Sequence, residues 1–306
     1  MARVGLVGLG LMGRGIGMSV LRAGHGLGVV AHRRREVATE LIALGAWEAP
    51  DPAALAARCD AIVCCLPSID AATQVLTGPR GVAAAGAKGL LVIESSTLTP
   101  AAAVELEARL AADGIDFVDA PVTRGPNEAL AGRLAALVGG RPGAVDRAEP
   151  ILRAYCEKVF RFGTAGCGYS AKLINNFLAF TSLAAVAEAM ATARGAGLDL
   201  PLLLQAIATS GGQSRVLDGL APVIAGTGAS RSRVTIETAH KDVDYYARFA
   251  RAAGTAGPMA ERVVERLRVA LDAGWGERFT PEYLDFVTGA PAAKAKNVST
   301  DPGAPD

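Results

Sequence analysis

Apolar residues in the first half of the chain gather in short runs that are separated by longer amphipathic stretches. The runs cover residues 3–7, 27–31, 61–66, 90–94 and 116–119, and two later runs cover residues 133–138 and 159–162. Strands that alternate with helices are typical of βαβ units around a parallel sheet. One of the helices is expected over residues 100–112, because Thr99 can cap it and Pro100 suits its first position.

The second half has a different pattern, with long Ala- and Leu-rich stretches and few β-branched clusters. One long helix is expected from Tyr169 to about Gly195, another after Asp199, and two more over residues 239–253 and 258–272. The pattern therefore predicts an α/β domain over residues 1–165 and an all-helical domain over residues 166–290. Residues 291–306 are rich in Ala, Pro and Lys without periodicity, and we expect them to fray.

Composition and charge narrow the class of protein. Hydrophobic residues make up 51% of the 306 residues, and 31 basic residues nearly balance 30 acidic ones, for a net charge of +1. This balance gives no reason to expect a nucleic acid as partner, although a small anion remains a suitable ligand. Glycines interrupt the apolar N-terminus, and no run approaches 18 uninterrupted apolar residues, so neither a signal peptide nor a membrane partner is expected.

The five cysteines include no CxxC pair and have no cluster of histidines beside them. This argues against a disulfide framework and against a metal site. Cytoplasmic localisation is the expectation that follows.

A glycine-rich turn follows the first expected strand and opens a helix. It reads Gly8-Leu9-Gly10-Leu11-Met12-Gly13, and this context is the one that a dinucleotide-binding GxGxxG pattern needs. Gly8 would permit the tight turn, Gly10 would let the backbone approach a pyrophosphate, and Gly13 would allow close helix packing. The free N–H groups and the dipole of the helix favour the phosphates.

The end of the second strand bears on which dinucleotide is bound. It reaches His32, Arg33 and Arg34 without the carboxylate that would bind the ribose hydroxyls of NAD. These cations could hold a 2′-phosphate, so NADP is favoured over NAD, and a solvated basic helix start is the alternative. Further cofactor contacts are expected at the ends of two other strands, where ordinary loop chemistry is the alternative: Leu66, Pro67, Ser96 and Thr97.

Lys172 and Asn176 lie one turn apart near the start of the long helix and therefore share a face. Beside a cofactor, an ammonium and an amide could hold a carbonyl or hydroxyl group and exchange its proton. For an isolated pair of this kind, a solvated helix face is the commoner role.

Four motifs, taken together and in order, point to one family. They are the glycine turn, Asp119-Ala120-Pro121-Val122-Thr123-Arg124-Gly125, the segment with Gly168, Lys172, Asn175 and Asn176, and His240-Lys241-Asp242. On these motifs the chain resembles the β-hydroxyacid dehydrogenase family, which includes 3-hydroxyisobutyrate dehydrogenases and tartronate semialdehyde reductases. The resemblance extends to about residue 290. It implies an α/β Rossmann-type N-terminal domain followed by an all-α C-terminal domain, joined by a long helix.

The resemblance also implies roles for individual residues. Lys172 matches the proton-transferring lysine, Asn176 the amide that orients the substrate, and Lys241 a position that closes over the nicotinamide. The segment after Asp-Ala-Pro-Val usually reads Ser-Gly-Gly in the family. Here Thr123 keeps a hydroxyl group and Gly125 keeps a backbone N–H for a substrate carboxylate.

Arg124 departs from the family pattern. A similar arginine occurs in sulfolactaldehyde reductases, which suggests a substrate with a stronger or additional anionic group that a guanidinium can grip. The alternative is that Arg124 points to solvent or pairs with Glu128.

The resemblance therefore implies an NAD(P)-dependent enzyme that interconverts a small β-hydroxy acid and its aldehyde or keto acid. The alternatives are a sulfolactaldehyde-type reductase, an imine reductase, which usually lacks the lysine, and a nucleotide-binding protein without catalysis. The chain is short for a 6-phosphogluconate-type decarboxylating enzyme. A homodimer or homotetramer is expected, because the long Ala-rich helix would expose apolar surface to a partner subunit.

Overall fold

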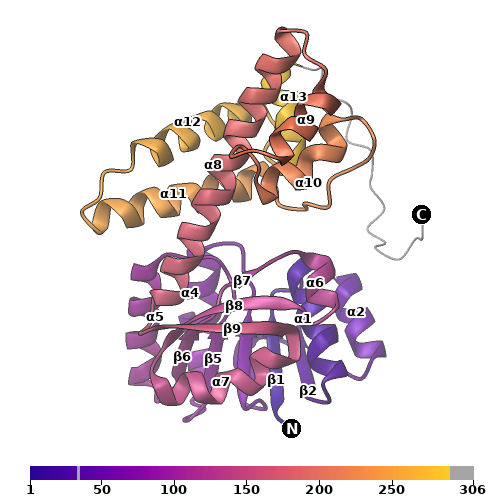
Figure 1. Cartoon of the computed structure of the whole chain (residues 1–306). Coiled ribbons are helices and arrows are strands. Elements are labelled where there is room, and N and C mark those ends of the chain that lie inside the picture. Colours follow the sequence, from indigo (N-terminus) through magenta and orange to yellow (C-terminus); the bar gives the residue numbers. More distant parts are fainter. Residues whose placement is uncertain (33–34, 290–306) are drawn as a thin grey trace. The chain divides into compact units, whose positions relative to one another are not determined.

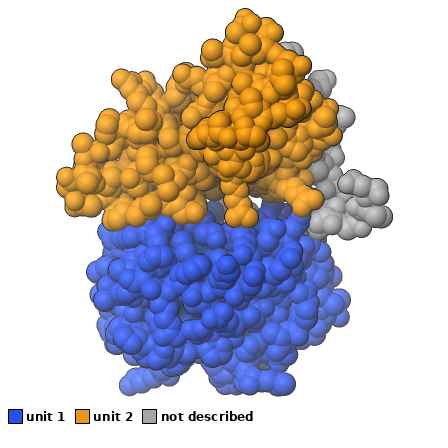
Figure 2. All heavy atoms as spheres, in the orientation of Figure 1, with its two compact units in different colours: residues 1–173 blue, residues 174–306 orange. Residues whose placement is uncertain are grey.

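The computed structural model describes residues 1–32 and 35–289, which divide into two compact units with the boundary between Leu173 and Ile174 (Figure 2). The division falls inside a long helix, α8 (Cys167–Gly195). The reason is that the first turn of α8 packs into unit 1, where Tyr169 is fully buried. The expected terminal segment, residues 291–306, lies outside the described residues.

The first unit is built on a mixed sheet whose larger part is parallel (Figure 1). Its six parallel strands lie in the order β3-β2-β1-β4-β5-β6. Antiparallel pairing then adds β8 beside β6 and β7 beside β8, and β9 pairs parallel with β8. The strands are β1 (Arg3–Val7), β2 (Gly26–Val30), β3 (Trp47–Glu48), β4 (Ala61–Cys64), β5 (Leu91–Glu94), β6 (Asp116–Asp119), β7 (Val122–Thr123), β8 (Leu134–Gly140) and β9 (Cys156–Gly163).

Successive strand residues enter two different cores, which shows that both faces of the sheet are covered. On β1, Val4 and Leu6 enter one core and Val7 enters the other; on β4, Val63 and Cys64 divide in the same way. Continuous apolar strands are typical of a sheet with helices on both faces. The helices of this unit are α1 (Leu11–Arg22), α2 (Arg35–Ala43), α3 (Pro52–Ala56), α4 (Ile69–Thr77), α5 (Pro100–Ala112), α6 (Pro126–Leu130) and α7 (Pro142–Tyr155), with a 3₁₀ turn at Val82–Ala85.

The strand register brings four chain segments to one edge of the sheet. Val7 pairs with Cys64, Cys64 with Glu94, and Glu94 with Asp119. Each of these residues ends its strand, so the segments that follow β1, β4, β5 and β6 emerge side by side. In open α/β sheets this carboxyl edge is where ligands bind.

The second unit is helical. It continues α8 and adds α9 (Leu200–Ala208), α10 (Arg215–Ile224), α11 (Ile236–Ala252), α12 (Pro258–Asp272), a 3₁₀ turn at Thr280–Glu282 and α13 (Tyr283–Thr288). Asp199 caps α9 by accepting a hydrogen bond from the Leu202 N–H, as the sequence predicts. The two-domain α/β and all-α architecture is therefore confirmed.

Candidate active site

The glycine turn has the geometry that its sequence predicts. Gly8 has a φ of 101°, and a Cβ there would lie 2.1 Å from the Cys65 carbonyl oxygen. A Cβ on Gly13 would lie 1.9 Å from the Gly8 carbonyl oxygen, whereas a Cβ on Gly10 would meet nothing within 4 Å. Gly8 and Gly13 are thus required by the fold, and Gly10 leaves open space before the first turn of α1. No side chain caps that turn, so its N–H groups suit the phosphates of a dinucleotide.

The segments after β4 and β5 are joined by a hydrogen bond. The Leu66 N–H donates to Ser96 Oγ at 2.6 Å, and the Ser96 N–H donates to Glu94 Oε2 at 3.1 Å. Leu66, Pro67, Ser96 and Thr97, which the sequence predicts as cofactor contacts, therefore belong to two adjoining segments at the carboxyl edge.

At the end of β2, the predicted 2′-phosphate site is described only in part. His32 is exposed, and Arg33 and Arg34 lie outside the described residues. Arg35, the next residue, pairs with Glu48 through its guanidinium, with one N–O distance of 3.0 Å. Neither Val30 nor Ala31 at the end of the strand offers a carboxylate for a ribose hydroxyl.

Two buried carboxylates at the carboxyl edge were not among the residues predicted as site residues. Asp119 ends β6 and accepts hydrogen bonds from the N–H groups of Gly166 and Tyr169, each at 2.9 Å. These donors belong to the start of α8, so the carboxylate holds the first turn of the helix that carries Lys172. Burial raises the pKa of Asp119 to about 6, against the opposing effect of these hydrogen bonds.

Glu94 is the second buried carboxylate and has no exposed surface. It accepts hydrogen bonds from the Tyr169 hydroxyl, the Ser96 hydroxyl and the Ser96 N–H. Burial raises the pKa of Glu94 to about 7, although the hydrogen bonds from Ser96 and Tyr169 lower it. The sequence did contain a signal, because Glu94 and Asp119 are acidic residues that directly follow the apolar residues of their strands.

Lys172 lies three residues after Tyr169 on α8. Its positive charge acts on Cys65, which directly follows β4: burial raises the pKa of the Cys65 thiol to about 12, and Lys172 opposes this rise. Lys172 therefore belongs to the helix whose first turn Asp119 and Glu94 hold at the carboxyl edge. A side chain that carries a proton at this edge can exchange it with a hydroxyl or carbonyl group.

The Thr123-Arg124-Gly125 segment differs from its sequence interpretation. Arg124 has a φ of 78°, a left-handed conformation that no other non-glycine residue adopts within the described residues. Its guanidinium donates to Glu157 at 2.6 Å and to the Arg133 carbonyl oxygen. Arg124 is therefore in an ion pair, but with Glu157 and not with Glu128.

Glu128 has another role in this segment. Its carboxylate accepts a hydrogen bond from the Gly125 N–H at 3.1 Å, at the start of α6. The N–H predicted to bind a substrate anion is thus engaged within the protein, and the Thr123 hydroxyl is the remaining predicted donor.

In the second unit, Asn176 and Lys241 meet at a buried carboxylate. Asn176 Nδ2 donates to Asp242 Oδ2 at 2.6 Å, and Lys241 Nζ lies 2.7 Å from Asp242 Oδ1. Lys241 Nζ also lies 4.8 Å from the centre of the Tyr245 ring. Asp242 is only 3% exposed and links α8 to α11, so it is more than an ordinary surface partner of Lys241.

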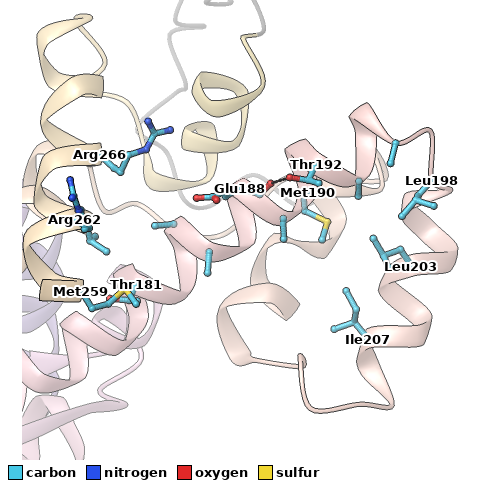
Figure 3. Close-up of a pocket in the computed structure, with 16 residues that line it drawn as sticks. Thr181, Glu188, Met190, Thr192, Leu198, Leu203, Ile207, Met259, Arg262 and Arg266 are labelled. Atoms are coloured by element: carbon cyan, nitrogen blue, oxygen red, sulfur yellow. Dashed lines mark hydrogen bonds between the residues drawn. The ribbon is translucent and has the colours of Figure 1, made fainter.

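A groove in the second unit runs beside α8 and is separate from these residues (Figure 3). None of the predicted site residues that the structure describes lines it. Its lining is mostly apolar, with Ala185, Ala189 and Leu203 among the contributors, and its charged members are Glu188, Arg262 and Arg266. Its walls offer no counterpart of the glycine turn.

All five cysteines are free. Within residues 1–32 and 35–289, no three His, Cys, Asp or Glu side chains are grouped so that they could hold a metal ion.

Two family models together match most of the chain. The model described as the NAD binding domain of 6-phosphogluconate dehydrogenase matches residues 3–163. The model described as the NAD-binding region of NADP-dependent 3-hydroxyisobutyrate dehydrogenase matches residues 166–280. The first match covers the α/β part of the chain, and the second covers the helical part.

Curated and solved proteins resemble the chain over most of their length. An L-threonate dehydrogenase of Escherichia coli O6:H1 is 33% identical over 96% of this chain and 97% of its own. An L-threonate dehydrogenase of Cupriavidus necator is 37% identical over 72% of this chain and 74% of its own. The crystal structure of a 3-hydroxyisobutyrate dehydrogenase from Salmonella typhimurium is 31% identical and has a TM-score of 0.82, covering 93% of this chain and 99% of its own.

A further solved structure bears on the cofactor. Psf3 in complex with NADP⁺ and 2-OPP is 28% identical, has a TM-score of 0.79, and covers 93% of this chain and 99% of its own. That protein therefore shares its overall fold with this chain and is solved with a nicotinamide nucleotide bound.

Proposed function

Because the chain belongs to the β-hydroxyacid dehydrogenase family, we propose that Lys172 is the general acid/base of its reaction. The chain is an NAD(P)-dependent oxidoreductase that acts on the CH–OH group of small hydroxy acids. The observation that carries the proposal for Lys172 is its place on α8, directly after the turn that Asp119 and Glu94 hold at the carboxyl edge.

The proposed mechanism assigns one task to each group of residues. The glycine turn at residues 8–13 would hold the phosphates of a nicotinamide nucleotide, which would supply reversible hydride transfer to and from the carbinol carbon. Lys172 Nζ takes the hydroxyl proton during oxidation and gives it back during reduction. The Thr123 hydroxyl donates to the substrate carboxylate.

The substrate that we propose is a small hydroxy acid with a single carboxylate, such as a polyhydroxy acid of the threonate type. The names of two relatives, both L-threonate dehydrogenases, support this class. The ion pair of Arg124 with Glu157 also supports this class, because a guanidinium that is already paired binds a second anionic group of a substrate less well.

A turnover screen tests this proposal. The purified enzyme is given L-threonate, 3-hydroxyisobutyrate, L-serine and 3-sulfolactate with each oxidised cofactor, and reduced nicotinamide is followed by absorbance. We expect threonate or another monocarboxylate to give the highest kcat/KM. A preference for 3-sulfolactate would contradict the proposed class, and no turnover of any hydroxy acid would contradict the function.

Lys172→Ala tests the role of the lysine. Loss of one general acid/base typically lowers kcat by about 10²–10⁴-fold, and the Kd of the cofactor should change little because the glycine turn is untouched. Turnover like that of the wild type would remove Lys172 from the mechanism.

NADP is the cofactor that we propose in preference to NAD. The end of β2 bears no carboxylate to repel a 2′-phosphate, and His32 with the neighbouring arginines provides positive charge. Titration with NADPH and NADH, followed by nicotinamide fluorescence, should give the lower Kd for NADPH. A lower Kd for NADH would contradict this preference.

We also propose that a second copy of the chain covers the groove beside α8. A two-fold interface brings a surface against itself, so a surface with apolar area and charges of both signs can be complementary to itself. The groove provides them, with Glu188 on α8 opposite in charge to Arg262 and Arg266 on α12 (Figure 3).

By length and composition α8 could also cross a membrane, and 33% of its most apolar window is buried.

Size-exclusion chromatography with light scattering tests whether a second copy of the chain or a lipid membrane covers the groove. A dimer or tetramer is expected for the wild type, and Ala185→Arg, in the groove, should shift it toward monomer. Ala101→Arg, on the exposed face of α5, serves as the control. A monomeric wild type, or association that requires lipid vesicles, would contradict the proposal.

A further inference from the structure

A chain of buried hydrogen bonds links the start of α8 to the segments after β4 and β5. The Tyr169 hydroxyl donates to Glu94, the Ser96 hydroxyl donates to Glu94, and the Leu66 N–H donates to Ser96 Oγ at 2.6 Å. Tyr169 and Glu94 have no exposed surface, and Ser96 is 4% exposed. The network therefore connects the helix that carries Lys172 with two of the predicted cofactor segments, all within the first unit.

We propose that Glu94 is a positioning residue that, through Tyr169 and Ser96, fixes the Lys172 helix relative to the cofactor segments. This inference rests on the proposed function, in which Lys172 exchanges the proton. It assigns to Glu94 and Tyr169 no contact with substrate or cofactor.

The cost of the network argues for a role beyond stability. Glu94 ends β5 between β4 and β6, and the other residues of β5 and all residues of β4 are apolar and buried. A carboxylate in such a place is expensive to bury unless its hydrogen bonds are satisfied, and an apolar residue of similar volume would serve packing as well. What an apolar residue cannot do is to hold two chain segments at fixed hydrogen-bond distances.

Two carboxylates restrain the first turn of α8 in different ways. Asp119 accepts from the backbone N–H of Gly166 and Tyr169, which fixes the position of the helix axis at its start. Glu94 accepts from the Tyr169 side chain, which fixes the rotation of the helix about that axis. Lys172 is three residues further on, so a change in rotation at Tyr169 moves the lysine directly.

A small displacement is enough to affect catalysis. A misplacement of about 1 Å in a reacting group can lower the rate by about 100-fold. Loss of the Tyr169 hydroxyl removes the restraint on rotation and leaves the backbone hydrogen bonds to Asp119 in place.

Tyr169→Phe is therefore the central test, and the chain offers a matched control. Tyr155 is equally buried, and its hydroxyl lies 3.2 Å from Ser95 Oγ, but it belongs to α7 and not to α8. Tyr155→Phe removes a buried hydroxyl of the same kind without touching Glu94. Thermal unfolding of both variants shows whether they are equally destabilised.

The expected kinetic result separates positioning from stability. Tyr169→Phe should lower kcat between about 10- and 100-fold, with cofactor KM within about twofold of the wild type. The isotope effect on kcat should rise with a substrate deuterated at the carbinol carbon, because the chemical step becomes slower. Tyr155→Phe should keep the kcat of the wild type. Equal kcat in the two variants, whether lowered or unchanged, would overturn the inference.

Variants at Glu94 provide a test by rescue. Glu94→Gln keeps an oxygen that accepts the Tyr169 hydrogen bond and should retain most of kcat, whereas Glu94→Leu should resemble Tyr169→Phe. If Glu94→Gln loses as much kcat as Glu94→Leu, the acceptor role assigned to Glu94 is wrong.

Hydrogen exchange in the absence of substrate makes the test independent of turnover. Amides in peptides that cover residues 166–173 should exchange faster in Tyr169→Phe than in the wild type, and at the wild-type rate in Tyr155→Phe. If the exchange differs as expected but Lys172→Ala retains full turnover, the proposed function fails and the structural restraint stands. If the exchange is unchanged, the restraint itself is disproved.

Discussion

The α carbon of Gly13 lies so close to Gly8 that a Cβ at residue 13 would be 1.9 Å from the Gly8 carbonyl oxygen. Gly13→Ala therefore requires the turn between β1 and α1 to shift. Overpacking of this kind typically costs about 1–3 kcal/mol, and we expect the free energy of unfolding without cofactor to fall by that amount. Denaturant unfolding of the apoprotein is the measurement.

Gly10→Ala is the matched variant in the same turn, because a Cβ there meets nothing within 4 Å. The free energy of unfolding should fall by about 1 kcal/mol or less, because alanine is a poorer N-cap than glycine but its methyl group meets no neighbouring atom. The Kd of NADPH should nevertheless rise, since the methyl group occupies the space open to the pyrophosphate. A Kd unchanged by Gly10→Ala would place the phosphates elsewhere.

Arg124→Gly removes a left-handed arginine and places there the residue that tolerates this conformation. The left-handed backbone costs a non-glycine residue roughly 1–2 kcal/mol, whereas the lost ion pair with Glu157 is partly exposed and worth about 0–1 kcal/mol. We expect the midpoint of thermal unfolding to stay the same or rise. The kcat/KM values for monocarboxylate substrates should all change by a similar factor.

If Arg124→Gly lowers kcat/KM only for a substrate with a second anionic group, Arg124 takes part in binding that group. In that case the Glu157 ion pair breaks when the substrate binds, and Arg124 reads the additional anionic group. The ratio of kcat/KM values for 3-sulfolactate and threonate is the quantity to compare.

The buried Glu94 carboxyl gives a pH dependence of stability. Burial raises its pKa from 4.5 to about 7, so between these pH values the folded protein holds a proton that the unfolded chain has released. The stabilisation is fully present below about pH 4.5 and is lost as the pH rises through about 7. The loss is on the order of 3 kcal/mol, at about 1.4 kcal/mol per pKa unit.

Glu94→Gln isolates this contribution, because the neighbouring Asp119, Tyr169, Cys64 and Cys65 remain. The free energy of unfolding of the wild type minus that of Glu94→Gln should fall between pH 4.5 and 7. Denaturant unfolding at several pH values measures it. A difference that is flat across this range, or that rises, would mean that Glu94 is ionised in the folded protein throughout.

Asp242 should contribute more to stability than an acidic residue two positions along the same helix. Asp242→Asn removes the charge that holds Lys241 and Asn176, and hydrogen bonds to charged groups are worth about 1.5–3 kcal/mol. Asp244→Asn breaks a pair with Arg248, whose side chain is 65% exposed, and should cost less than about 1 kcal/mol. Equal losses of unfolding free energy would show that the buried cluster contributes no more to stability than the exposed ion pair.

Regular elements could be predicted where the local signals agree. The bounds of α5, Pro100–Ala112, match the prediction because Thr99 and Pro100 mark its start. β9 begins earlier than predicted, at Cys156, because its next residues, Glu157 and Lys158, are charged and exposed at the edge of the sheet. A strand at the edge of a sheet can expose polar residues to solvent, so a search for apolar runs detects only part of it.

The candidate site could be predicted only as far as motifs reach. The glycine turn and Lys172 lie in short, recognisable segments, but Glu94 and Asp119 become neighbours only through the register of β5 and β6. Arg124 shows the same limit. Its partner Glu157 is 33 residues away, whereas the nearby Glu128 binds the Gly125 N–H. Spacing along the chain favoured the wrong carboxylate.

The register that aligns Val7, Cys64, Glu94 and Asp119 has a consequence for how such a protein can evolve. The residues that hold the start of α8 belong to β5 and β6, whereas Thr123 and Arg124 lie beyond them, on and after the short strand β7. Mutations at the latter positions can accumulate without disturbing the attachment of the lysine helix. Changes at a few neighbouring codons can therefore alter the segment after β6 while the attachment of α8 is inherited unchanged.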